Sequence, residues 1–270
     1  MAKLFSDRNR PVHMGRFPTE ILKRSPQMPD LDGLAPWPDL SFQRPADSAS
    51  LVPAMAEFQA MMDAVRDGPQ NSAPSEIPED RQERSNHLKA FAYFNDISMV
   101  GIAPLSPEDR LTAPRRNPQI DRLSLALQTR QTKTLAAGID VIMADLKESM
   151  TSKPQPMDHH AYALVFLVAY RRDPRRGETG CDWVQDAQAE RAAVLGAETA
   201  TVLANYIRIL GYSARAHSAT TCDVDLARLA VKAGLAQVAG EQISHPWLGQ
   251  RFGLAAVTTD MALAPDLPLA

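Results

Sequence analysis

Apolar runs along the chain predict the strands of a single sheet. The longest runs from Tyr162 to Tyr170 and is nearly continuous, with β-branched and aromatic members, as expected for a strand covered on both faces. Shorter strands are predicted at Ile97–Ala103, around Ser213–His217 and at Phe252–Thr259. We therefore expect four or five strands.

Apolar positions at helical spacing predict helices between these strands. The periodic residues fall in three groups: Leu51, Met55, Phe58, Met62 and Val65; Leu135, Ile139, Ile142, Met143, Leu146 and Met150; and Leu195, Val202, Tyr206 and Ile209. Each row is expected to face the core.

Capping residues and glycines mark the predicted helix ends. Asp182 and Gln185 form a capping-box pattern that would open the helix ending at Gly211. Further helices are predicted at 86–94 and from Asp223 to Val238, the latter stopped by Gly240. Helices alternating with few strands predict an α/β (α+β) sandwich with helices on both faces of one sheet.

Prolines divide the chain into two parts. Eleven of the 21 prolines lie before residue 80. Proline fixes φ and lacks an amide donor, so this region is not expected to form regular helix or central strand. We predict a Pro-rich extended N-terminal arm with one helix over 1–83, and the folded domain over 84–270.

Composition narrows the function classes. A net charge of -3 over 270 residues gives no reason to expect nucleic acid or an anionic membrane as partner. Two cysteines favour a reducing cytoplasm and cannot supply a four-cysteine iron–sulfur cluster. The N-terminus shows no export signal and no apolar run is long enough to span a bilayer, so a soluble cytoplasmic protein is expected.

Candidate chemistry is sparse. Adjacent His159 and His160 would point to opposite strand faces, so we interpret them as ordinary histidines rather than metal ligands. His217, Cys222 and Asp223 cluster within seven residues, and zinc would need three or four such ligands in tetrahedral arrangement. Asp223 or Thr221 would serve better as a helix cap, so we do not expect a metal site. Phosphate-loop, nucleophile-elbow and zinc-helix motifs are absent.

The order of motifs resembles the reductive dehalogenases and their epoxyqueuosine-reductase relatives. The matching segments are Val100–Leu105, Ile209–Tyr212, Leu229–Leu235, Val257–Asp260 and Asp266–Leu269. The resemblance implies a nitroreductase-like, cobalamin-binding-domain-like fold over 84–270. It also implies cobalamin and 4Fe-4S clusters in the parent system, and an organohalide substrate that is reductively dehalogenated with a tyrosine as proton donor.

Within that resemblance, His217, Lys232 and Gly234 are the candidate cofactor-binding residues. The catalytic residue is unknown, with Tyr162, Tyr206 and Tyr212 as candidates by type. The family's cluster cysteines would follow Leu269, and its Gly-Leu-Gly is replaced by Gly234-Leu235-Ala236. We therefore expect a degenerate, structural N-terminal copy of the corrinoid fold that binds no cofactor itself. Its expected partner is the catalytic corrinoid and iron–sulfur half of the same enzyme.

Two alternatives stay open. One is a functional corrinoid- or flavin-binding nitroreductase-like module, for which the cleft near His217 and Lys232 must be open. The other is a non-enzymatic dimerisation or scaffold protein, in which the arm wraps a second subunit to form a homodimer.

Overall fold

The computed structural model describes residues 8–40, 42, 49–129 and 153–270. Its centre is a four-stranded antiparallel sheet in the order β1-β3-β8-β4. These strands span Met99–Pro104, Tyr162–Ala169, Phe252–Thr259 and Ala214–His217 respectively. Within the described residues, no helix is long and apolar enough to cross a membrane.

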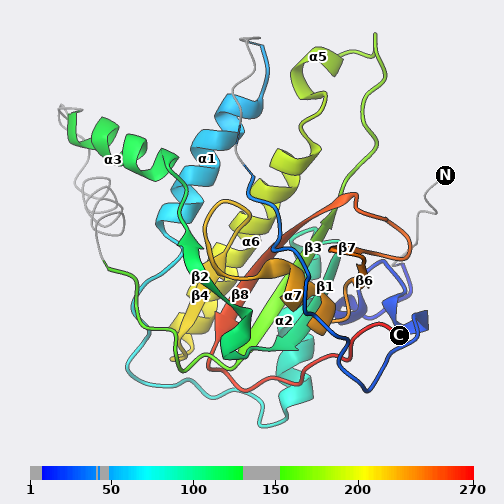
Figure 1. The fold of residues 1–270 in the computed structure, drawn as a ribbon. Coiled ribbons are helices and arrows are strands. Elements are labelled where there is room, and N and C mark those ends of the chain that lie inside the picture. The colour runs from blue at the N-terminus through cyan, green and yellow to red at the C-terminus, as the bar shows by residue number, and fades with distance from the viewer. Residues whose placement is uncertain (1–7, 41, 43–48, 130–152) are drawn as a thin grey trace.

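Helices cover both faces of this sheet, as predicted for an α+β sandwich (Figure 1). On one face, α7 (Leu226–Lys232) packs with the arm residues Leu31 and Leu34. On the other, α2 (Arg81–Phe94) and α6 (Gln188–Ile209) enclose a second core. Because both faces of β3 and β8 are covered, the apolar side chains on both sides of these strands are buried, which explains their continuous apolar runs.

Peripheral elements flank the sandwich. They are η1 (Val12–Met14), η2 (Thr19–Ile21), α1 (Val52–Ala64), η3 (Pro107–Asp109), α3 (Gln119–Thr129) and α5 (Cys181–Val184), with the strand pairs β2 (Arg110–Arg115) with β5 (Cys222–Val224) and β6 (Gln237–Ala239) with β7 (Gln242–Ser244). The predicted helix over 135–150 lies outside the described residues.

The buried faces of α1 and α6 differ from the predicted ones. Helix α6 buries small residues such as Ala193, Gly196 and Ala200, whereas Tyr206 and Ile209 are exposed. Helix α1 likewise buries Ala56 and Ala60 and exposes Phe58. Small side chains let a helix backbone pack close to its neighbours. Each helix therefore buries its small-residue face rather than the face with the larger apolar side chains.

Two predicted helices have other boundaries in the structure. Asp182 belongs to the short α5, and α6 begins after Ala187 without a side-chain cap. The helix predicted from Asp223 to Val238 is only α7, whose cap is Asp225, which accepts hydrogen bonds from the amides of Ala227 and Arg228. Asp223 lies in β5 instead, and the predicted stop Gly240 is the turn of the β6–β7 hairpin.

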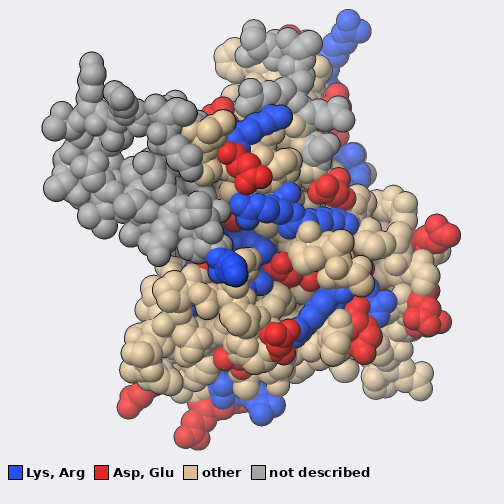
Figure 2. All heavy atoms as spheres, turned by 60° about the vertical axis from the view of Figure 1, so that its left-hand side comes forward, with Lys and Arg blue, Asp and Glu red and all other residues tan. Residues whose placement is uncertain are grey.

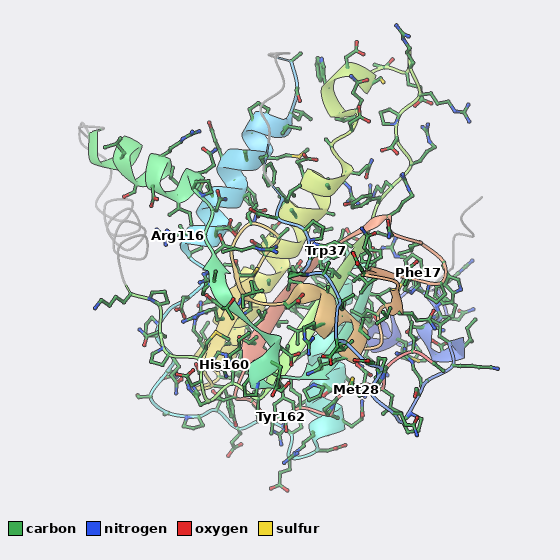
Figure 3. The ribbon with its side chains drawn as sticks, viewed as in Figure 1. Phe17, Met28, Trp37, Arg116, His160 and Tyr162 are labelled. Atoms are coloured by element: carbon green, nitrogen blue, oxygen red, sulfur yellow. The ribbon has the colours of Figure 1, made fainter. Side chains whose placement is uncertain are left out.

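The predicted arm reaches deep into the body. Phe17 stacks on Trp247 with ring centroids 6.3 Å apart, and Trp37 stacks on Phe252 at 5.4 Å (Figure 3). Arg24 forms an isolated bridge with Leu269 near the other end of the chain. The arm therefore contributes to the core on the α7 side. The domain boundary at residue 83 stays a prediction.

Candidate functional site

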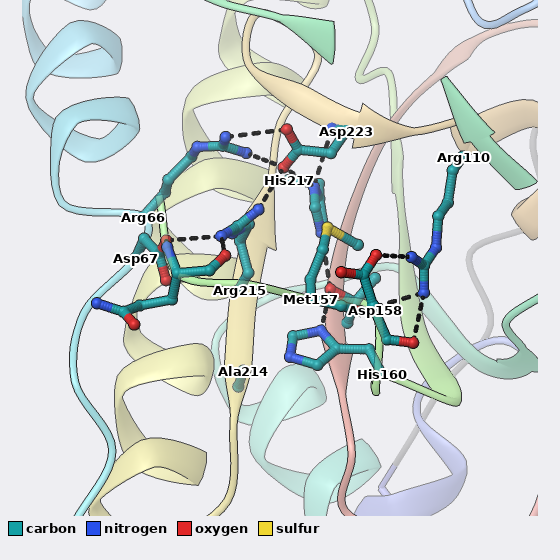
Figure 4. A network of polar contacts seen from close by, with 12 residues as sticks. Arg66, Asp67, Arg110, Met157, Asp158, His160, Ala214, Arg215, His217 and Asp223 are labelled. Atoms are coloured by element: carbon teal, nitrogen blue, oxygen red, sulfur yellow. Dashed lines mark hydrogen bonds and ion pairs between the residues drawn. The ribbon is translucent and has the colours of Figure 1, made fainter. Parts of the chain in front are cut away.

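His217 is fully buried on β4, with both ring nitrogens in hydrogen bonds (Figure 4). Its Nδ1 accepts from the Asp223 amide at 3.3 Å, so the proton of the neutral ring sits on Nε2, which lies 2.9 Å from Thr258 Oγ1. Burial lowers the pKa of His217 well below its usual value. The imidazole is therefore neutral and directed at protein groups.

A second histidine continues this hydrogen-bond chain. Thr258 Oγ1 accepts from His217, so its own proton is available to His160 Nδ1 at 2.8 Å. His160 Nε2 then donates to Ser213 Oγ at 2.8 Å. Burial lowers the pKa of His160 to about 4. The chain joins β4, β8 and the turn before β3, and it fixes the tautomer of both rings.

Two arginines and two aspartates border the histidines. Arg66 holds Asp223 with hydrogen bonds of 2.7 and 3.2 Å, and Arg215 bridges Asp223 at 3.2 Å and Asp67 at 2.8 Å. Burial alone would raise the pKa of the Asp223 carboxyl, but the guanidinium groups hold it below its usual range. Each charge in this group is balanced by an opposite one.

Charges of both signs also alternate on the surface shown in Figure 2, where basic side chains lie beside acidic ones. That mixture gives no field of one sign for steering an anionic ligand.

Lys232, the last residue of α7, is buried and paired. Its Nζ lies 2.6 Å from Asp109 Oδ2 and 2.8 Å from Ser106 Oγ. Asp109 is fully buried and also accepts from the Ser106 amide at 2.9 Å. The ammonium group thus ties α7 to η3.

Gly234 allows the arm to approach the backbone closely. Its φ of +65° favours glycine, and a side chain there would collide with Arg24 and the Leu267 carbonyl. Arg24 Nη1 donates to the carbonyls of Gly234 at 2.7 Å and Leu267 at 2.9 Å. The space beside Gly234 is therefore filled by the chain's own arginine. His217, Lys232 and Gly234 each contact different partners and do not converge on one cavity.

The arm forms one wall of the cavity beside α7. A cavity of about 360 Å³ lies under the arm segment 35–40, between α6, α7 and β8. Its wall includes Ala219, from the loop after β4, and Ala227 of α7. Trp37 is part of its lining and stacks on Phe252 with an interplanar angle of 15°.

The tyrosine candidates do not form a common site. Tyr206 is exposed on the outer side of α6, whereas Tyr162 and Tyr212 are partly buried against the α2–α6 core. A catalytic tyrosine stays unassigned.

Metal ligands are equally dispersed. Cys181 and Cys222 are free and buried, and burial raises the pKa of Cys222 to about 12. Among the described residues, no group of three or more histidine, cysteine, aspartate or glutamate side chains could hold a metal ion.

Sequence reasoning missed a buried carboxylate at Asp63 on α1. It accepts hydrogen bonds from Gln59, Asn117, Ser218 and Thr220, at 2.5 to 3.0 Å. The chain separations of 54 to 157 residues for three of these donors left no local signal. The Ser106-Pro107-Glu108-Asp109 capping box was readable, because Ser and Asp stand three residues apart.

Comparison with solved structures gives full-length matches of this chain. The catabolic reductive dehalogenase NpRdhA is 33% identical over 100% of this chain and 32% of its own, with a TM-score of 0.72. Its complex with 3-bromo-4-hydroxybenzoic acid matches at 33% identity and a TM-score of 0.71. A reductive dehalogenase described for B12-dependent dehalogenation matches at 34% identity, covering 99% of this chain and 32% of that one, with a TM-score of 0.72.

The match to a second group of solved structures, the epoxyqueuosine reductases, is much weaker. The epoxyqueuosine reductase from Streptococcus thermophilus is 15% identical over 68% of this chain and 48% of its own, and its TM-score of 0.41 is too low to carry an argument. No family model and no curated protein matches. This chain spans about a third of the reductive dehalogenases that it matches along its whole length. On that whole-length similarity, the chain belongs to a reductive dehalogenase-like family.

Proposed function

We propose that this chain is the structural, cofactor-free N-terminal region of a cytoplasmic cobalamin-dependent reductive dehalogenase. In this account it supports the catalytic corrinoid and iron–sulfur portion, which removes halide from an organohalide. The catalytic portion would supply all cofactors and the organohalide site. The matched enzymes carry this proposal because they share the fold at 33–34% identity and are about three times as long.

The observation that most favours a structural role is the filled cleft. Trp37 occupies the space between β8 and α7, Arg24 occupies the space beside Gly234, and Lys232 is paired with Asp109. The cavity under the arm, of about 360 Å³, is at the low end of the roughly 300–1,000 Å³ typical for drug-sized ligands, and a second cavity beside Arg24 and Leu235 measures about 370 Å³. Cobalamin is much larger than such ligands, so these residues do not fit a bound corrinoid.

Halide release tests the proposal. The purified chain is mixed with cobalamin and a chemical reductant, and bromide is measured with 3-bromo-4-hydroxybenzoic acid, the ligand of a matched structure. Reduced cobalamin without protein is the control. We expect the chain to add nothing to the control rate, and release well above that rate would contradict the structural role.

A further inference from the structure

The outer face of α6 carries an exposed apolar row. Val202, Tyr206 and Ile209 are 49%, 46% and 56% exposed. Their spacing of four and three residues places them on one side of the helix. This is the row that helical periodicity predicts to be buried, and no segment among the described residues buries it.

A hollow lies beside this row, between α6 and α2. Tyr206 stacks on Phe91 of α2 with ring centroids 6.4 Å apart and an interplanar angle of 9°. The adjoining cavity measures about 340 Å³. Its lining includes the apolar side chains of Ile77, Leu88, Phe91, Leu210 and Met261.

The surroundings of the hollow match those of a protein interface. Phe94, one helical turn beyond Phe91, is 83% exposed, and the polar side chains of Glu76, Arg84 and His87 line the edge. Apolar anchors around a pocket with a polar rim are the usual anatomy of an interface. Scattered apolar residues on a surface need no partner, but a row next to an aromatic pair and a hollow does.

The lengths of the matched reductive dehalogenases indicate which partner would cover the α6 row and the hollow. The matched reductive dehalogenases are covered over only 32% of their length, so about two thirds of each polypeptide lies outside the match. That portion must pack against this unit somewhere, because domains of one chain share interfaces of roughly 600–1,500 Å². The opposite side of the sheet is already covered by this chain's own arm and α7.

We propose that the α2–α6 groove, defined by Phe91, Phe94, Val202, Tyr206 and Ile209, is the surface on which the larger portion of a reductive dehalogenase polypeptide docks. Apolar side chains of that portion fill the hollow and cover the α6 row. This inference rests on the proposed function and adds the location of the contact.

A cleavable chimera tests the groove. This chain replaces the matched third of NpRdhA, with a protease site at the junction, so that both parts fold within one polypeptide. After cleavage, analytical ultracentrifugation measures whether the parts stay paired, and absorbance measures the cobalamin held by the larger part. The variant carries Val202→Ser, Tyr206→Ser and Ile209→Ser together, and Trp183→Ser on α5, 57% exposed, is the matched control.

We expect the unaltered and Trp183→Ser chimeras to stay paired. The triple variant should dissociate with a Kd raised about 1,000-fold, since each of the three interface anchors contributes about a tenfold change. If circular dichroism shows that the triple variant is unfolded, Ile209→Ser alone should raise the Kd about tenfold.

Two results distinguish a failure of the docking inference from a failure of the proposed function. Triple-variant parts that stay paired as tightly as the unaltered parts would remove the groove from the interface. An unaltered chimera that holds no cobalamin or separates on cleavage would refute the proposed function itself, and the docking inference with it.

Discussion

At the scale of single residues, several buried polar groups are held by other side chains of the same chain. Asp63 shows this most clearly, because both of its oxygens accept two side-chain hydrogen bonds. Burial raises the pKa of this carboxyl despite the four donors. The cluster joins α1 to the loop after β4 and to the start of α3.

Replacing Asp63 with alanine should destabilise the fold by about 2–4 kcal/mol, because four buried donors lose their acceptor. Chemical denaturation with urea measures the change. Asp121→Ala, which removes an exposed carboxylate, is the control and should change the free energy of unfolding by less than about 0.5 kcal/mol. Equal effects in the two variants would contradict this view of Asp63.

The histidine chain predicts a loss of stability on acidification. Burial lowers the pKa of His160 to about 4, whereas an unfolded histidine titrates near 6.5. The unfolded state therefore binds more protons below about pH 6.5, and stability falls as the pH drops toward 4. His217 acts in the same direction, because burial lowers its pKa too.

Comparison with His160→Gln isolates this effect, since Gln can still bond Thr258 and Ser213 but does not titrate. The melting temperature of the unaltered chain should fall more between pH 7 and pH 5 than that of the variant. The carboxylates titrate in both proteins and cancel in the comparison. Parallel curves would show that His160 is not buried in its neutral form.

At the scale of elements, the sequence predicted strands better than helix faces. The runs at 162–170 and 252–259 are found as β3 and β8 almost to the residue, because both are covered on both faces. The periodic rule failed for α6, which packs through Ala and Gly against β8. Hydrophobicity ranks Ile209 above Ala200, yet Ala200 is the buried one, because a small side chain lets the helix approach β8 closely.

Gly196 makes this packing testable. A Cβ at Gly196 would lie 2.9 Å from the Cβ of Ala255 on β8, closer than methyl groups tolerate. Gly196→Ala should therefore destabilise the fold by about 1–3 kcal/mol, although alanine is the better helix former by about 1 kcal/mol. Glu198→Ala, on the exposed side of α6, should be neutral in the same thermal melts. A stabilised Gly196→Ala variant would mean that α6 and β8 are further apart than described.

At the scale of the whole molecule, the family and the sandwich could be predicted from the order of weak motifs, but the state of the cleft could not. Gly234 was a candidate cofactor-binding residue, yet the side chain beside it is that of Arg24, which lies 210 residues away in the chain. Trp37 lies in the predicted arm, yet its stacking on Phe252 depends on how the arm folds back. Long-range contacts of this kind leave no periodic signal.

On these contacts we propose that the arm closes the cleft and that this chain binds no corrinoid. Equilibrium dialysis of the purified chain against cobalamin tests this claim most directly. We expect equal cobalamin concentrations on both sides of the dialysis membrane at saturating cobalamin. One cobalamin bound per chain would contradict it.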